Sequence, residues 1–560
     1  MTKRTLRFLR YLPIILLIVI NLTLGVIFVK DYGESWDEPI VYAYGSRTIQ
    51  VYSNFLLAGK APTWANEPLA NYGPFYYAAG EELARLFMRL VPAWSHIDSW
   101  HLVNFITFQI GILCLYFLSK RWMKSWAAFA TALLFSTQPL LWGHAFINPK
   151  DISFMTFFLA SVTLGYVMVD RVSASAREES RSKSGTPSGQ TAKNQENPVR
   201  LESRQAGRRF IAWAEQAGRL LVNPWVLGAG LVLGLATSIR VLGPMAGGIV
   251  MLYAIYKSWK KALVLLAPYA LVAILTTYLS WPYLWASPVY RYLESVVFMS
   301  HFPFEGSILF QGALFPQGNL PKIYLPYLMA IQLTEVVLPL FIAGLLLSVW
   351  QAWKTKQIEP FVLILFWFVL PLTAIIFSST IYFDNFRHLL FLMPPIFIAV
   401  GIALEGLLSR IKWNILRGAI VCLLVIPGIL AGISLHPYQF VYYNSDIGGV
   451  RGAQGRFTLE YWGVSFAESA RYVNEIAPTG ASVVIYGPEP IFQDYARPDL
   501  KVYASADVKP GIHYDFVVIY SRINEVETVC PSVRAAKTIA RDGAVLGVVK
   551  IPPVSGSGCP

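Results

Sequence analysis

The chain has 560 residues, of which 55% are hydrophobic and 14% are charged, and its formal net charge is +13. This composition is too apolar for an ordinary soluble protein, and the apolar residues come in long runs. The positive charge alone would favour binding to nucleic acid, but its distribution along the chain argues against that interpretation.

The first apolar run covers residues 11–29 and holds no charged side chain over 19 positions. That is close to the ~20 residues that a helix needs to cross a bilayer. Basic residues precede the run, as they also do in a cleaved signal peptide, but Phe28-Val29-Lys30-Asp31 is not a small-residue cleavage site. We therefore predict an uncleaved first span.

The apolar runs predict a polytopic α-helical membrane protein with about 11 transmembrane helices. The predicted spans lie near 11–29, 102–119, 126–142, 152–169, 224–239, 241–256, 262–281, 326–350, 360–380, 388–408 and 418–434. With the N-terminus inside, the inner segments hold 25 of the 46 Lys and Arg residues, the outer loops 10, and the segment from about 435 the other 11. This asymmetry follows the positive-inside rule and predicts a multi-pass protein of the cytoplasmic membrane with its C-terminal part outside.

Residues 30–101 are predicted to form a long first outer loop. The pieces 38–59 and 76–91 have apolar and polar faces at helical spacing. We expect two helices that lie flat at the membrane interface, and a partly ordered loop is the alternative.

Two adjacent carboxylates, Asp37 and Glu38, follow Trp36 in this loop and precede Pro39. An acidic pair before a proline is an ordinary loop feature. Beside a membrane span, however, it is also suited to chemistry at the bilayer surface, where a carboxylate can act as a general base. Such a pair can also hold a divalent ion, and the sequence leaves open whether one binds.

Other outer turns carry further charged side chains. Asp151, at the start of the fourth span after Pro149, suits the positive end of a helix dipole, which is its structural interpretation. Lys150 and Arg240 are cations on the same predicted side, and an arginine between two apolar runs must face water or an anion. The loop between spans nine and ten adds Asp384, Arg387 and His388. The alternative interpretation of Arg240, Arg387 and His388 is that they only anchor the chain at the membrane interface.

Two segments outside the spans differ in composition. Residues 170–222 are rich in Ser, Arg, Glu, Gly and Gln and are predicted to form a disordered cytoplasmic loop. Residues 436–560 are predicted to form a small extracytoplasmic α/β domain, with a helix around 465–476 and buried strands at 483–486, 516–520 and 546–549. Residues 1–435 would then form the transmembrane domain.

The cysteines and the spacing of His, Cys, Asp and Glu give no firm metal or disulfide prediction. Cys530 and Cys559 lie in the outward segment and would pair if their compartment is oxidising, which the sequence leaves open. Neither C-x-x-C nor H-E-x-x-H occurs in the chain. No metal ligand is therefore assigned.

The gathering of carboxylates and cations at one edge of the membrane suits transfer from a lipid-anchored phosphate donor. Cations would stabilise the phosphate as its bond to carbon breaks, and a carboxylate would accept the proton of the incoming hydroxyl. A lipid-linked-sugar transporter or flippase is the alternative, and it would need ionisable groups deep in the spans, which are scarce here. A third alternative, a sensor or assembly protein, would not explain the acidic pair in the first outer loop.

Five segments resemble the GT-C glycosyltransferases of the protein O-mannosyltransferase kind, a glycosyltransferase family 39-like group that includes the lipid A aminoarabinose transferases. They are Trp36-Asp37-Glu38, GHAFINPKDISF at 143–154, YFDNFRHLLFLMPP at 382–395, HPYQFVYYNSDIGGVRGA at 436–453 and Glu460-Tyr461-Trp462-Gly463. The resemblance covers nearly the whole chain except 170–222 and the last ~60 residues.

This resemblance implies an enzyme of the cell envelope, a hexosyl- or pentosyltransferase that uses a polyprenyl-phosphate-linked sugar and inverts the anomeric centre. By it, Asp37 is the base, Glu38 supports acceptor or donor binding, and Asp151 is the second acid. Arg387 and His388 match the segment near the donor phosphate, whereas Lys150 and Arg240 are added here from their positions. The acceptor is a protein, glycan or lipid, and membrane lipids, not nucleic acid, are the other partners.

The chain departs from the family pattern at Gln332-Leu333-Thr334-Glu335, where many relatives carry a lysine before a proline. This end of the donor site is therefore left unassigned.

Overall fold

The computed structural model describes residues 11–60, 64, 67–183, 211, 214–303, 306–316, 318–378, 381, 383–509, 512–523, 525–553 and 559. The chain divides into two compact units. Unit 1 comprises Met1–Lys60, Tyr77–Met155 and Val297–Pro560, and unit 2 comprises Ala61–Tyr76 and Thr156–Val296.

Unit 1 contains a helix bundle and a mixed β-sheet. Its helices are α2 (Leu12–Phe28), α3 (Glu38–Ala58), α4 (Phe75–Leu90, which begins in unit 2), α5 (His96–Ser119), α6 (Ser125–Ser136), α7 (Pro139–Ile147), α13 (Tyr324–Ile331), α14 (Val337–Lys354), α15 (Glu359–Ile364), α16 (Leu370–Phe377), α17 (Met393–Leu408), α18 (Asn414–Ser434), α19 (Gly449–Ala453), α20 (Phe466–Ile476), α21 (Glu489–Tyr495) and α22 (Glu525–Thr528). A π-helical turn, Leu365–Val369, joins α15 to α16, and a 3₁₀ turn, Arg387–Leu392, leads into α17.

Unit 2 is built from long helices. They are α8 (Asp151–Lys183, whose first residues belong to unit 1), α10 (Pro224–Ile239), α11 (Pro244–Ser280, bent at Ser258) and α12 (Pro288–Ser300, whose last residues belong to unit 1). The predicted disordered loop 170–222 is therefore helical at its start, where α8 continues to Lys183, and another helix covers Ala214–Leu221. Residues 184–210 lie outside the described residues.

The chain is a helical protein with several helices able to cross a membrane. Among the described residues, seven are long and apolar enough, or eight if one bent pair counts as a span, and Leu12–Phe28 and Ser125–Ser136 are shorter apolar helices. The predicted number of eleven is not confirmed. The predicted helices at 11–29, 102–119, 224–239 and 418–434 correspond closely to α2, α5, α10 and α18.

Two predicted spans are wrong in detail because the chain breaks inside them. The span 126–142 ends at Ser136, and α7 begins at Pro139, whose ring cannot donate to the preceding turn. The span 326–350 is interrupted between Ile331 and Val337. Gln138 in the first break bonds to Thr334 in the second. The Gln138 Nε2 donates to Thr334 Oγ1 (3.1 Å), and the Gln138 Oε1 accepts from the Thr334 amide (3.0 Å). Gln138 and Thr334 thus satisfy each other, which favours burial of both in an apolar environment.

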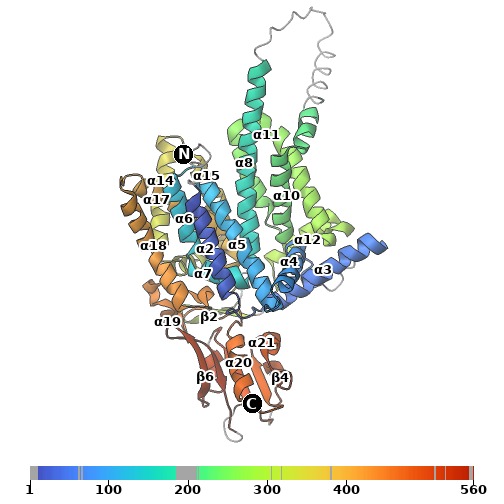
Figure 1. Cartoon of the computed structure of the whole chain (residues 1–560), viewed down its shortest axis with the longest axis vertical. Helices are drawn as coiled ribbons and strands as arrows, with labels where there is room; N and C mark the ends of the chain where they lie inside the picture. Colours follow the sequence, from blue (N-terminus) through green and yellow to red (C-terminus); the bar gives the residue numbers. More distant parts are fainter. Residues whose placement is uncertain are drawn as a thin grey trace, which may run out of the picture. The chain divides into compact units, whose positions relative to one another are not determined.

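Both helices predicted in the first outer loop are present, as α3 and α4. In Figure 1, α3 runs across the direction of α2 and α5. Gly45 of α3 allows close packing in this region, because a Cβ there would lie 2.5 Å from the Tyr77 carbonyl oxygen of α4. The loop is therefore largely helical rather than irregular.

A five-stranded sheet occupies the C-terminal part of unit 1, in the order β4-β3-β5-β7-β6. The strands are β3 (Ser482–Tyr486), β4 (Lys501–Ala504), β5 (Phe516–Tyr520), β6 (Ala535–Arg541) and β7 (Ala544–Lys550). β3 pairs in parallel with β4 and β5, whereas β7 pairs antiparallel with β5 and β6. Within unit 1, the sheet lies at the end of the bundle opposite to the start of α2 (Figure 1).

The predicted strands at 483–486, 516–520 and 546–549 and the predicted helix at 465–476 are confirmed as β3, β5, β7 and α20. The edge strands β4 and β6 are missing from the prediction because they are mostly exposed or half-buried and lack an apolar run. A short hairpin of β1 (Ser307–Phe310) and β2 (Ala313–Pro316) is likewise missing. Cys530 and Cys559, left open above, form a disulfide with a Cα–Cα separation of 5.1 Å.

The packing of α14 on α17 generates a stability prediction. A Cβ on Gly344 of α14 would overlap the carbonyl oxygen of Ala399 on α17, a backbone atom that cannot move away cheaply. We expect Gly344→Ala to lower the free energy of unfolding by about 1–3 kcal/mol. Thermal unfolding of the detergent-solubilised chain measures this change.

Gly432→Ala on α18 is the matched control, because nothing lies within 4 Å of a Cβ there. This variant is expected to unfold at the wild-type temperature or slightly above it. Equal unfolding temperatures for the two variants would contradict the close helix contact.

Candidate active site

The first outer loop places Asp37 at the start of α3 and turns its carboxylate toward two cations. Asp37 occupies the N-cap position, yet its side chain makes no capping hydrogen bond. Its Oδ1 lies 3.0 Å from Lys150 Nζ, and its Oδ2 lies 3.3 Å from Arg387 Nη1. The side chains of Asp37 and Lys150 are 13% and 10% exposed, so this ion pair is largely removed from water.

Hydrogen bonds to backbone carbonyl groups hold the loop that carries Asp37. The Trp36 amide donates to the Trp462 carbonyl (2.8 Å), and Ser35 Oγ donates to the Ile147 carbonyl (2.7 Å). Gly33 packs closely against Val464, because a Cβ on Gly33 would lie 2.5 Å from the Val464 carbonyl oxygen. The position of Asp37 is therefore set by chain segments before α8 and before α20.

Glu38 has partners that differ from those of Asp37. It is fully buried and accepts hydrogen bonds from the Ser35 amide (2.7 Å) and the Tyr42 hydroxyl (2.9 Å), and it lies 3.2 Å from His101 Nε2. The two neighbouring carboxylates thus serve different networks. The proposed divalent ion at this pair stays a prediction; among the described residues no group of three or more His, Cys, Asp or Glu is arranged to hold a metal.

Asp151 begins α8 and is fixed by Asn148. The Asn148 Oδ1 accepts from the Asp151 amide (3.0 Å), and Asn148 Nδ2 donates to Asp151 Oδ2 (2.8 Å). This reciprocal pair resembles a capping box and explains why the helix begins here. The same Oδ2 lies 3.5 Å from Arg387 Nη1. Asp151 therefore combines the expected helix-start role with a place beside Asp37.

Arg387 joins the acidic residues. One guanidinium nitrogen, Nη1, contacts Asp37 and Asp151, and the other, Nη2, lies 3.4 Å from Asp384 Oδ2. Asp384 Oδ1 in turn lies 2.8 Å from Arg522 Nη2. We call Asp37, Asp151, Asp384, Lys150, Arg387 and Arg522 the ion-pair cluster. Its three carboxylates and three cations balance in charge, as a buried group of ions requires.

Aromatic rings and unsatisfied donors surround Arg387. Its guanidinium carbon lies 4.4 Å from the Trp462 ring centroid and 5.2 Å from that of Phe383. Within the described part of the chain, Arg387 Nε and Trp462 Nε1 are buried and have no hydrogen-bond acceptor. Buried N–H groups are nearly always paired, so these two donors indicate a place for a ligand oxygen.

A second series of polar contacts reaches Asp151 through Asn148. Tyr461 OH lies 3.2 Å from His144 Nε2, and His144 Nδ1 lies 3.1 Å from Asn148 Nδ2. His144, Asn148, Tyr461 and Trp462 lie within the segments quoted for the family resemblance, but the sequence assigned them no role. The sequence also assigned no role to Arg522. The signal that could have identified it is its position as a basic residue just beyond the buried strand β5.

Two predicted donor-site residues are not part of the ion-pair cluster. His388 follows Arg387, and its ring meets that of Phe383 edge-on, with 4.7 Å between centroids. Arg240 belongs to unit 2, where its guanidinium lies 6.0 Å from the Tyr72 ring centroid. Their roles at the phosphate stay predictions.

Two more carboxyl groups near the first loop have raised pKa values, which favour their protonated forms. Burial raises the pKa of Glu34 to about 10, helped by a hydrogen bond with Asp494 and by the charge of Glu38. Burial also raises the pKa of Glu460 to about 8, although the amides of Gly463 and Val464 donate to this carboxyl group and oppose the rise. Neither group therefore adds a full negative charge beside the ion-pair cluster.

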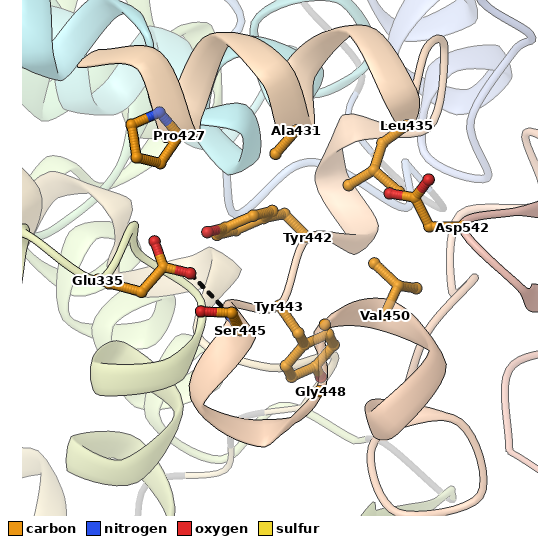
Figure 2. A pocket seen from close by; sticks show the side chains of 11 residues that line it. Glu335, Pro427, Ala431, Leu435, Tyr442, Tyr443, Ser445, Gly448, Val450 and Asp542 are labelled. Atoms are coloured by element: carbon orange, nitrogen blue, oxygen red, sulfur yellow. Dashed lines mark hydrogen bonds between the residues drawn. The ribbon is translucent and has the colours of Figure 1, made fainter. Parts of the chain in front are cut away.

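Glu335, at the departure from the family pattern, lies in a separate cavity of about 360 Å³ (Figure 2). Its Oε1 accepts a hydrogen bond from the Ser445 amide (2.7 Å). One wall of the cavity comes from Pro427 and Ala431 of α18 and from Leu435, the C-cap residue of this helix. Tyr443 links the cavity to the turn before Arg387, because its hydroxyl lies 3.4 Å from Asn385 Oδ1.

No protein-family model and no curated protein matches the chain. Among solved structures, it is similar to ArnT from Cupriavidus metallidurans bound to undecaprenyl phosphate (TM-score 0.48, 13% identity, 97% of this chain and 99% of that chain). It is also similar to the apo state of ArnT (TM-score 0.46, 13% identity, 96% and 97%). A third similar structure is the arabinofuranosyltransferase AftD from mycobacteria (TM-score 0.42, 10% identity, 95% and 41%).

Because the TM-scores are below 0.5 and the identities are 10–13%, we infer the function of this chain from its own side chains.

Glu460 generates a pH prediction. The folded chain binds its proton up to about pH 8, whereas an exposed glutamate releases it near its ordinary value of 4.5. The folded state therefore loses stability as the pH rises from about 4.5 to about 8. We expect Glu460→Gln, which cannot titrate, to show a smaller fall in unfolding temperature between pH 5 and pH 8 than the wild type, even if it is less stable throughout.

Thermal unfolding at pH 5, 6.5 and 8 measures this difference. Glu34 shifts in the same direction but is present in both proteins, so the comparison cancels its contribution. An identical fall in both proteins would contradict the raised pKa of Glu460.

Proposed function

We propose that this chain is an integral-membrane glycosyltransferase that moves a sugar from a polyprenyl-phosphate donor to an acceptor hydroxyl, with Asp37 as the general base. One observation carries the proposal: Asp37 shares Lys150 and Arg387 in a largely buried cluster at the start of the first outer loop. A base and the cations that would hold a phosphate are thereby within one ion-pair distance of each other.

Lys150 and Arg387 are suited to the donor phosphate. Arginine offers several donors in a fixed planar geometry, and lysine adds a compact charge. The unpaired N–H groups of Arg387 and Trp462 give an oxygen ligand two further donors. As the bond between the sugar and the phosphate breaks, negative charge grows on the phosphate oxygens, and the cations stabilise it.

Asp37 accepts the proton of the acceptor hydroxyl in the same step. A phosphate that engages Lys150 and Arg387 competes with Asp37 for these cations, which leaves the carboxylate a better proton acceptor. The hydroxyl oxygen then bonds to the anomeric carbon, the bond to the phosphate oxygen breaks, and polyprenyl phosphate leaves. One displacement inverts the anomeric centre and needs a single base.

The residues with less direct evidence take supporting roles in this proposal. Asp151 helps to orient Arg387, and Glu38 holds the loop through Ser35 and Tyr42. His388 and Arg240 are assigned to the donor side from sequence alone. No step is assigned to a metal ion.

We further propose that the reaction takes place on the outer face of the cytoplasmic membrane. The excess of Lys and Arg in the inner segments favours an inside N-terminus. The disulfide between Cys530 and Cys559 favours an oxidising compartment for residues 436–560, the proposed extracytoplasmic domain, beside a transmembrane domain of residues 1–435. The first outer loop is on the same side, as a lipid-linked donor requires.

Replacing Asp37 by asparagine tests the base. In cells that lack the protein, the unconsumed lipid-linked sugar should accumulate and be identified by mass spectrometry. Wild-type protein should remove this lipid and release polyprenyl phosphate, whereas Asp37→Asn should leave it in place at more than ~100-fold lower turnover, because a general base contributes about 10²–10⁴-fold. Undecaprenyl phosphate, the ligand named for the ArnT structure, is the probe for retained binding.

Asp446→Asn is the matched control, since Asp446 is an exposed carboxylate in unit 1 outside the ion-pair cluster. It should behave as wild type. Turnover by Asp37→Asn equal to that of the control would exclude Asp37 as the base. A flippase would instead move the lipid-linked sugar across a liposome membrane without releasing polyprenyl phosphate.

A further inference from the structure

We propose that Arg522 is a positioning residue of the donor-phosphate site: it holds Asp384 and thereby fixes the orientation of Arg387. This inference rests on the proposed function, in which Arg387 is a principal cation for the phosphate. The two oxygens of Asp384 are divided between the arginines, with Oδ1 2.8 Å from Arg522 Nη2 and Oδ2 3.4 Å from Arg387 Nη2. Asp384 therefore connects the C-terminal sheet to the site.

The sheet presents Arg522 at a suitable edge. β5 ends at Tyr520, two residues before Arg522, and it runs parallel to β3. The carboxyl end of parallel strands is where such sheets commonly place ligand-binding side chains. Backbone contacts fix this edge, because the Leu459 amide donates to the Arg522 carbonyl (3.4 Å) and the Glu460 amide donates to the Ser521 carbonyl (3.2 Å).

The turn that carries Asp384 needs such external support. Asp384 and Asn385 have φ angles of 53° and 63°, a left-handed conformation that Asp and Asn adopt more readily than other non-glycine residues but still at some cost in free energy. Asn385 Nδ2 donates to the Thr458 carbonyl (3.3 Å), and Tyr443 OH donates to the same oxygen (3.0 Å). Segment 457–460 thus contacts both the turn and the sheet edge, so the backbone and the Arg522 side chain hold the turn together.

Charge balance explains why Arg522 matters for the phosphate. With Arg522, the ion-pair cluster has three carboxylates and three cations. Without it, Asp384 would draw the Arg387 guanidinium toward itself, and the cluster would carry one excess negative charge. Both effects oppose the binding of an anion at Arg387.

Binding of undecaprenyl phosphate to the full chain in phosphatidylcholine nanodiscs tests the proposal. We expect Arg387→Gln to weaken binding by more than ~10-fold and Arg522→Gln to weaken it by roughly 5–10-fold, because one buried charge contact is lost. Arg522→Lys keeps the positive charge and should recover at least half of that loss. Asp384→Asn removes the carboxylate that Arg522 holds but also makes the cluster less negative, so weakened binding by this variant would reflect the loss of positioning and not the charge.

The double variant separates positioning from a general charge effect. If Arg522 acts through Arg387, adding Arg522→Gln to Arg387→Gln should weaken binding by less than ~2-fold further. A full additional 5–10-fold loss would overturn the positioning role, since it would mean that Arg522 acts on the phosphate independently.

Arg497→Gln is the matched control for a loss of stability. Arg497 pairs with Asp499 and contacts carbonyl groups after α20 in the same C-terminal part of the chain. We expect it to lower the unfolding temperature while leaving binding at the wild-type value. If Arg522→Gln does not fold, Asp384→Asn with and without Arg387→Gln decides the same question.

The outcomes distinguish this inference from the proposed function. Wild-type protein that does not bind undecaprenyl phosphate would overturn the proposed function and this inference together. Weakened binding by Arg387→Gln with unchanged binding by Arg522→Gln would overturn the inference alone.

Discussion

The structure of the candidate site depends on one buried guanidinium. Arg387 contacts Asp37, Asp151 and Asp384, which come from the first outer loop, the start of α8 and the turn before α17. A cation only 7% exposed must be paired, and the carboxylates that pair it must reach it from different parts of the chain. Because of this requirement, three segments come together although more than 100 residues separate each of them from the next in the sequence.

Segment 457–464 serves as the second junction. It accepts a hydrogen bond from the Trp36 amide, and its Trp462 ring stacks on Arg387. It also bonds to the sheet edge at Ser521 and Arg522. The sheet is therefore continuous with the site through hydrogen bonds within unit 1. In the proposed reaction, the helix bundle supplies the base and the lysine, whereas the C-terminal part supplies the support that orients the arginine.

Several features were predictable from sequence because each has a local cause. Apolar runs of suitable length predicted α2, α5, α10 and α18, and buried strands predicted β3, β5 and β7. The breaks at Thr137 and Gln332 were not predictable, because the pairing of Gln138 with Thr334 joins residues that are 196 positions apart in the sequence. The edge strands β4 and β6 lack an apolar run, so periodicity did not reveal them.

The sequence by itself determined that the chain is a helical membrane protein with Asp37, Asp151, Lys150 and Arg387 in its loops, because hydropathy and charge act locally along the chain. Only the tertiary structure decided which of these side chains meet. It separated Glu38, which bonds to Tyr42 and lies beside His101, from Asp37. It also paired Asp384 with Arg387 and added Arg522, to which the sequence assigned no role. Pairing of buried charges depends on distances between remote segments, and no local pattern records those distances.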